Sequence, residues 1–247
     1  MFDTKKSETM ETLPPPYSES SSSQPQTISR SRIPCPLNFY MGFNHFWLGR
    51  TQDEKLFAAS FGLGCFGRTV MTLYDGPSKN EPVLVTSRYK SGKYIMTIPD
   101  RPDSISVKSG KVKGDGEDIV IDSDHWRTCR FSMKVDDGEK GHTEDFEWRN
   151  SHGDEIKAVG GRTYGWKLVR LSSRTGGGMG STSDGLEVVA VVAQNASWSM
   201  SKSANIAFLG SGLNGNMGER WELAALLSGL LLWYKNYSAQ AAAAGAS

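Results

Sequence analysis

One segment near the carboxyl end limits the folds that this chain can adopt. Residues 221–237 read Trp-Glu-Leu-Ala-Ala-Leu-Leu-Ser-Gly-Leu-Leu-Leu-Trp-Tyr-Lys-Asn-Tyr. The segment consists mostly of strong helix formers and follows a glycine-rich turn, so it predicts a helix. Because residues 223–234 are apolar on every face except at Ser228 and Gly229, this helix must be buried on all sides.

Lipid or the protein's own strands could bury such a helix. The stretch 223–234 reaches only about 18 Å at 1.5 Å per residue, whereas a bilayer core is about 30 Å thick. We therefore expect no transmembrane anchor, and we expect strands of the same chain to enclose the helix. Small residues would let a surrounding wall approach closely, and these are Ala224, Ala225, Ser228 and Gly229.

The middle of the chain predicts many short β-strands, because β-branched and aromatic runs alternate with turn residues. The predicted strands cover 70–74, 83–89, 93–98, 119–121, 128–135, 143–149, 155–159, 164–171, 186–194 and 205–209. Residues 51–54 have the form of a capping box and predict a short helix through Ala59. In Phe146-Glu147-Trp148-Arg149 the alternation predicts a buried aromatic face and an exposed Glu147–Arg149 ion pair. This spacing of strands is typical of a β-sandwich or a β-barrel.

Composition divides the chain into three parts. Residues 1–35 are rich in Ser, Thr, Pro, Glu and Lys and poor in apolar side chains, which predicts a disordered N-terminal tail. Residues 36–238 have the composition of a β-rich globular domain. Residues 239–247 are small and featureless, and we expect a flexible C-terminal tail.

The residues resemble those of the tubby C-terminal-like superfamily, which includes tubby and LURP-one-like proteins. The likeness covers residues 60–237 and is strongest to an uncharacterised fungal family. It is carried by Phe-Glu-Trp-Arg-Asn-Ser at 146–151, Gly-Trp-Lys-Leu-Val-Arg-Leu at 165–171 and Gly-Glu-Arg-Trp-Glu at 218–222. The resemblance implies a mainly β fold, a closed antiparallel β-barrel of about twelve strands around a central hydrophobic C-terminal helix. It implies no catalytic residues, and no motif places the phosphoinositide pocket of tubby proteins on this chain.

The rest of the sequence argues against an enzyme. The formal net charge is +1, which does not favour a nucleic-acid partner. The three cysteines have no metal-ligand or disulfide-framework spacing, so we expect reduced thiols in a cytoplasmic protein, with no metal and no cofactor. Gly-Leu-Gly-Cys-Phe-Gly at 62–67 matches a dinucleotide fingerprint, but no long helix follows, and we interpret it as the entry into the first barrel strand. Acidic residues such as Glu144 and Asp145 are assigned to solvated turns.

The sharpest binding motif lies in the tail, at Pro14-Pro15-Pro16-Tyr17. This is the PPxY form that WW domains recognise, in which Pro14, Pro15 and Tyr17 are the ligand residues. Prolines favour the polyproline II conformation, so little entropy is lost on docking to an aromatic groove. We expect a WW-domain partner such as a HECT-type ubiquitin ligase. Nearby Ser18 and the serines at 20–23 are candidate phosphorylation sites that would alter docking.

Basic residues predict a second site, a face that contacts anionic lipid. They flank a predicted hairpin and a following strand–loop stretch, and they are Arg88, Lys90, Lys93, Lys108, Lys111 and Lys113. Each basic residue near a membrane surface contributes about 1 kcal/mol of attraction. We therefore expect a non-enzymatic binding module, cytoplasmic and peripheral at membranes, that binds a phosphoinositide headgroup. The alternatives are a protein-interaction scaffold or ubiquitin-ligase adaptor without a lipid role, and an unrecognised enzyme.

Overall fold

The computed structural model describes residues 32–42, 46–62, 69–124, 128–135, 141–175, 180–195, 202–213 and 215–245. The strands that build the main sheet are β1 (Leu37–Met41), β2 (Phe46–Gly49), β3 (Phe57–Phe61), β4 (Thr69–Tyr74), β5 (Val83–Lys90), β6 (Lys93–Pro99), β9 (Gly116–Asp124), β10 (Thr128–Val135), β11 (His142–Ser151), β12 (Gly161–Arg174), β13 (Leu186–Asn195) and β14 (Lys202–Phe208). Outside this sheet lie the hairpin β7 (Ile105–Lys108) and β8 (Lys111–Gly114), helix α1 (Asp154–Ala158), a 3₁₀ turn (Gly210–Gly212) and helix α2 (Glu219–Gly245).

The twelve strands of the main sheet form a closed barrel. Their order around the ring is β1-β14-β13-β12-β11-β10-β9-β6-β5-β4-β3-β2, and every neighbouring pair is antiparallel. Closure occurs because β1 pairs with β2 on one side and with β14 on the other. Closing the sheet removes exposed strand edges, which are otherwise sites of aggregation. The fold class expected from the sequence is confirmed.

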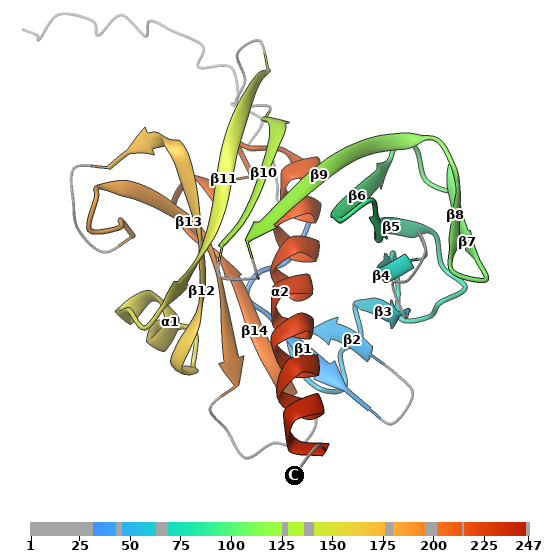
Figure 1. Ribbon diagram of the computed structural model, residues 1–247, viewed down its shortest axis with the longest axis horizontal. Coiled ribbons are helices and arrows are strands. Elements are labelled where there is room, and N and C mark those ends of the chain that lie inside the picture. Colours follow the sequence, from blue (N-terminus) through green and yellow to red (C-terminus); the bar gives the residue numbers. More distant parts are fainter. Residues whose placement is uncertain are drawn as a thin grey trace, which may run out of the picture.

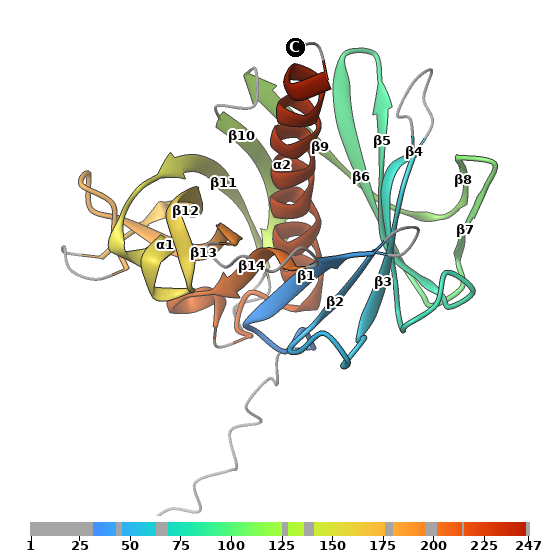
Figure 2. The same ribbon diagram turned by 90° about the horizontal axis from the view of Figure 1, so that it is seen from below.

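Helix α2 runs through this ring of strands (Figures 1 and 2). All thirteen side chains at 221–233 are buried or are glycine, and the apolar ones belong to the same core as the inward side chains of the strands. The helix contacts strands on every side of the ring, including β4, β5, β6, β10, β13 and β14. Its uniform hydrophobicity is therefore explained by strands that surround it. In the described part of the chain, no helix has both the length and the hydrophobicity needed to cross a membrane.

The helix lies directly against the wall at two of its small residues, Ser228 and Gly229. A Cβ atom on Gly229 would lie 2.7 Å from Val192 Cγ2 and 3.0 Å from Trp148 Cζ2, so only glycine fits there. At the preceding position, Ser228 Oγ accepts a hydrogen bond of 2.9 Å from Trp148 Nε1 and donates one to the Ala224 carbonyl. The buried indole and hydroxyl therefore satisfy each other, as buried polar groups must.

Strand β11 shows the predicted alternation of side chains. Phe146 and Trp148 point inward and are fully buried, and Phe146 packs against Trp221 of α2 at a ring separation of 5.9 Å. The expectation of an exposed ion pair on the other face is wrong for Glu147, which is only 4% exposed. It accepts a hydrogen bond of 2.6 Å from Arg149 and a second bond from Arg130 of β10.

Two local predictions are wrong because pairing across the barrel outweighs local patterns. Residues 155–159 do not form a strand. They lie largely in α1, whose buried Ile156 covers Val188 and Val191 on the outer face of β13. The helix predicted after Thr51 does not form either. Thr51 Oγ1 accepts a bond of 3.2 Å from the Glu54 amide, but the chain then enters strand β3, which pairs with β2 and β4.

Two further segments discussed in the sequence analysis can be placed in the fold. Helix α2 continues through Gly245, so most of 239–247 is helical, as expected physically for a run of alanines, the best helix former. The glycine-rich stretch 62–67 lies between β3 and β4, and of its residues only Gly62 is described. Since β4 is the fourth strand of the barrel, this stretch is not the entry to the first one.

Candidate functional site

Two hairpins of this fold end in the same four residues. The sequence Lys-Ser-Gly-Lys occurs at 90–93, where β5 turns into β6, and again at 108–111, where β7 turns into β8. In both turns the central residues have positive φ: 53° and 80° at Ser91 and Gly92, and 51° and 71° in the second turn. Positive φ at both central residues is the type I′ geometry that matches the twist of a two-residue hairpin.

This turn geometry places like charges directly opposite each other. Lys90 is paired with Lys93 and Lys108 with Lys111, and all four side chains are exposed. Like charges in directly opposed positions destabilise a strand pair. The arrangement therefore costs stability at both tips, which is the pattern expected when the charges serve binding.

The two tips lie at the same end of the barrel. The Thr69 amide and hydroxyl of β4 both donate to the Gly110 carbonyl in the second tip, at 2.8 and 2.9 Å. Thr69 is also paired with Arg88, two residues before Lys90. Figure 2 shows the two hairpins on the same side of the molecule. We use "lysine rim" for Lys90, Lys93, Lys108, Lys111 and the exposed Lys113 of β8.

Arg88, the sixth basic residue singled out in the sequence, differs from the lysines. Its guanidinium donates to Thr97 Oγ1 at 2.8 Å and to Asp118, so it is held against the sheet. Within the described part of the chain, none of the five rim lysines forms an ion pair with a carboxylate. The rim is thus a set of five uncompensated positive charges, with Arg88 as part of its support.

An aromatic pair and a further lysine lie next to the first tip. Tyr89 and Tyr94 pack with ring centroids 4.8 Å apart, and Lys235 of α2 places its Nζ 5.1 Å from the centre of Tyr94. Burial, with Tyr89 beside it, raises the pKa of Tyr94 to about 12. Burial lowers the pKa of Lys235, which the charges of nearby tyrosines only partly offset. Sequence reasoning missed Lys235 because its position beside the rim depends on how α2 passes through the barrel.

The opposite end of the barrel carries two arginines whose charges are paired with carboxylates. Arg32 forms ion pairs with Asp75 and Glu219. Arg220 lies 2.8 Å from Glu117 and 3.6 Å from Asp100. The lysine rim differs from these paired arginines, because it gathers five lysines that have no carboxylate partner among the described residues.

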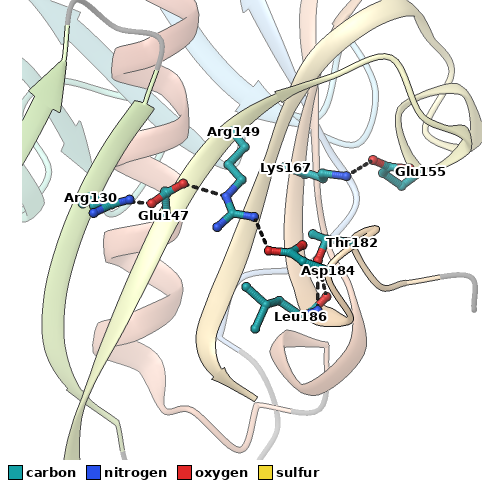
Figure 3. Close-up of polar contacts among 8 residues, drawn as sticks. All are labelled: Arg130, Glu147, Arg149, Glu155, Lys167, Thr182, Asp184 and Leu186. Carbon is teal, nitrogen blue, oxygen red and sulfur yellow. Dashed lines mark hydrogen bonds and ion pairs between the residues drawn. The ribbon is translucent and has the colours of Figure 1, made fainter. Parts of the chain in front are cut away.

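A polar network across β10–β13 likewise satisfies itself (Figure 3). Arg149 joins Glu147 to Asp184 at 3.2 Å, and hydrogen bonds from Thr182 and Arg149 lower the pKa of that aspartate. Lys167 Nζ on β12 lies 3.3 Å from Glu155 Oε1 on the neighbouring helix α1. Since these charges are paired within the protein, this face is better explained by strand register than by ligand binding.

The expectation that Glu144 lies in a solvated turn is wrong. It lies on β11, its side chain is 1% exposed, and its carboxylate accepts hydrogen bonds from Arg170, from Ser172 at 2.8 Å and from His142. Burial acts to raise its pKa, but the bonds from Arg170 and Ser172 outweigh it, so the pKa lies below its ordinary value. Arg170 also approaches Glu187 at 3.8 Å. The cluster is a buried, hydrogen-bonded ion pair.

The described cysteines are free and unreactive in character. Burial raises the pKa of both Cys35 and Cys129 to about 12, which leaves almost no thiolate at neutral pH. Among the described residues, no group of three His, Cys, Asp or Glu side chains is arranged to hold a metal ion. Pro14, Pro15 and Tyr17 lie outside the described residues.

Comparison with known proteins adds no relative to this geometry. No protein-family model matches the sequence, no curated protein matches it, and no solved structure matches the fold. The lysine rim and the tail motif are therefore the features from which a function is inferred.

Proposed function

We propose that this chain is a non-enzymatic binding module whose lysine rim engages the phosphates of an anionic lipid headgroup, such as a phosphoinositide, at the cytoplasmic face of a membrane. The observation that carries the proposal is the repeated Lys-Ser-Gly-Lys tip, which gathers opposed lysines at one end of the barrel. Lysine binds phosphate as a compact point charge. With a net charge of only +1 over the chain, attraction to an anionic surface must come from such local concentration.

The architecture supports the same proposal. A closed barrel around an apolar helix is the fold that the tubby-like resemblance implies, and we propose that the chain belongs to this structural class. Fold alone does not establish function, because one architecture hosts many activities. The site is therefore argued from its charges, and the resemblance adds only that a barrel of this kind is able to bind phosphoinositides.

Charge reversal at the rim tests the lipid proposal. We expect the full chain to co-sediment with phosphatidylcholine vesicles that contain a phosphoinositide, and not with vesicles of phosphatidylcholine alone. Replacing Lys90, Lys93, Lys108 and Lys111 with glutamate should lower the bound fraction at least tenfold, since each lysine contributes about 1 kcal/mol. The control is Lys79→Glu with Lys134→Glu, two exposed lysines away from the rim.

The control variant should keep most of the binding. Equal sedimentation of the rim variant and the control would contradict a site at the rim. Negligible sedimentation of the unaltered chain with both kinds of vesicle would remove the lipid role and leave the scaffold or adaptor role. Circular dichroism spectra must coincide among the proteins, which is expected because the substituted side chains are exposed.

We also propose that Pro14, Pro15 and Tyr17 recruit a WW-domain protein such as a HECT-type ubiquitin ligase. The motif itself favours this second role, because prolines and an aromatic anchor are the groups that such domains read. In a calorimetric titration with a WW domain of PPxY specificity, we expect Tyr17→Ala to weaken binding by about 2 kcal/mol, roughly thirtyfold. Pro25→Ala, in the same tail but outside the motif, should leave the affinity unchanged. Equal affinities for both variants would exclude the motif as the ligand.

A further inference from the structure

A groove on the outside of the barrel has the chemistry of a proline-binding surface. It has a volume of about 560 Å³ and lies where β2 and β3 meet the β4–β5 turn. Its lining residues are Phe46, Trp47, Lys55, Ala58, Pro77, Ser78 and Lys79. The Trp47 ring stacks on Tyr40 of β1 with centroids 5.5 Å apart and an interplanar angle of 16°. Phe46 and Trp47 are the aromatic side chains of the groove itself, and polyproline II ligands dock in aromatic-lined grooves.

Trp47 is also a buried donor without an acceptor. It is 8% exposed, and its Nε1–H has no hydrogen-bond partner in the described structure. An unsatisfied buried donor costs about 1–3 kcal/mol, so its presence calls for an explanation. Trp166 and Trp221 also have buried Nε1–H groups without a partner in the described structure, so the groove is assigned from its lining and its charges.

We propose that the occupant of this groove is the chain's own proline-rich segment, residues 14–17. The first argument is where the described chain begins. Arg32 forms an ion pair with Asp75, the first residue of the turn that carries Pro77 and Lys79. The Ala58 amide in the groove donates to the Gly76 carbonyl of the same turn at 2.6 Å. The described chain therefore begins close to the turn that borders the groove.

The proline-rich segment is also close enough along the chain to reach the groove. Tyr17 precedes Arg32 by 15 residues. A flexible chain of that length has a root-mean-square span of about 20 Å and a much longer maximum extension, so the segment reaches the groove without strain. Tethering at this length gives an effective concentration on the order of millimolar, at which even a weak contact is populated.

The charges beside the groove and those of the N-terminal segment are complementary. Lys55 and Lys79 are exposed beside the groove, and Lys55 places its Nζ 4.8 Å from the centre of Trp47. Residues 7–29 carry Glu8, Glu11 and Glu19 and contain no lysine or arginine. An acidic segment around the prolines thus meets a groove whose charged groups are basic. Phosphorylation of the serines at 20–23 would add negative charge and strengthen this attraction.

Docking within the chain competes with binding to a WW domain, because Tyr17 cannot occupy both grooves. The contact between residues 14–17 and the groove does not depend on the proposal that a WW domain binds the tail. Only the competition between the two depends on that proposal. A membrane or kinase that changes the charge near the tail would then alter how much of the motif is exposed. The barrel regulates access to its own tail in this arrangement.

Photo-crosslinking of the full chain tests the contact directly. With p-benzoylphenylalanine in place of Tyr17, we expect crosslinks within one molecule to peptides that contain the groove residues, at a yield independent of protein concentration. Lys55→Glu with Lys79→Glu should lower that yield about tenfold, because attraction becomes repulsion. Lys90→Glu with Lys93→Glu makes the same charge change at the far end of the barrel and should leave the yield unchanged.

Crosslinks spread over the barrel, or equal yields in both charge-reversed variants, would overturn the inference. Crosslinks that form only between molecules and rise with concentration would assign the groove to a second copy and overturn docking in cis. A WW titration of the same proteins separates the two proposals. Lys55→Glu with Lys79→Glu should bind the WW domain several-fold more tightly than the unaltered chain. If groove crosslinks form but no WW domain binds, the groove contact stands and the ligase-recruiting role fails.

Discussion

Replacing Leu227 with aspartate is expected to abolish the folded barrel, whereas the same substitution at Ala241 of the same helix should leave it intact. Leu227 is fully buried in the core that α2 shares with the strands, and Ala241 is exposed. Deleting a buried leucine side chain costs about 2–5 kcal/mol, and burying an unpaired carboxylate adds several more. That sum is comparable to the whole stability of a typical domain, about 5–15 kcal/mol.

Urea denaturation followed by circular dichroism and tryptophan fluorescence measures this difference. We expect Leu227→Asp to lack a cooperative transition and to be recovered mainly as aggregate, since transient exposure of the helix uncovers a large apolar surface. Ala241→Asp should unfold within about 1 kcal/mol of the unaltered chain. A folded Leu227→Asp protein with a normal midpoint would contradict the enclosure of α2 by the strands.

The enclosure of α2 was predictable because it depends on one local property, a short stretch of the helix, residues 223–234, that is apolar on nearly every face. Most strands from β4 onward were predictable for a similar reason, since residues 83–89, 93–98, 128–135 and 186–194 carry runs of β-branched and aromatic residues between turns. The short hairpin strands β7 and β8 were not predicted. The apolar stretch of the helix is too short to span a bilayer, so its burial required a surrounding wall of strands.

Elements that depend on distant partners were not predictable. Residues 51–54 carry a capping pattern, yet Phe57 and Ala59 are core residues whose pairing with β2 and β4 decides the conformation. Residues 155–159 contain the β-branched Ile156 and Val159, but they follow a strand end at which Asp154 and Glu155 favour the first turn of a helix.

The candidate sites show the same division. The rim lysines were visible as charges near turns, and the repeated Lys-Ser-Gly-Lys was a signal in the sequence that went unused. That the two tips lie at the same end of the barrel depends on the hydrogen bonds from Thr69 to the Gly110 carbonyl, which no local pattern encodes. The Trp47 groove is assembled from β2, β3 and a turn some thirty residues further along, so it appears only in the folded chain.

Removing Arg170 is expected to produce the second large effect, a loss of about 3–5 kcal/mol at pH 7 in the Arg170→Met variant. The reason is that Glu144, with a side chain 1% exposed, would keep a buried negative charge without its main counter-ion. Arg130→Met is the matched control. Arg130 also pairs with a buried glutamate, but it is 64% exposed and Glu147 retains Arg149, so we expect at most about 1 kcal/mol.

The pH dependence distinguishes this ion pair from a loss of packing. In the unaltered chain the pKa of Glu144 is lower in the folded state than in the unfolded state, so the pair contributes stability above the unfolded pKa, and this contribution fades as pH falls through the folded value. In Arg170→Met we expect burial to dominate and raise the pKa of Glu144 above its unfolded value. The variant then gains stability on acidification, because the carboxyl becomes neutral.

The stability difference between the two proteins should therefore shrink between pH 7 and about pH 4, as protonation removes the uncompensated charge. Urea midpoints at both pH values measure it, and Glu144→Leu combined with Arg170→Met should recover much of the loss by replacing the pair with apolar side chains. A pH-independent difference would mean that Arg170 acts through the packing of its aliphatic stem. In that case the charges of the cluster would not stabilise the pairing of β11 and β12, and only the fit of the side chains would.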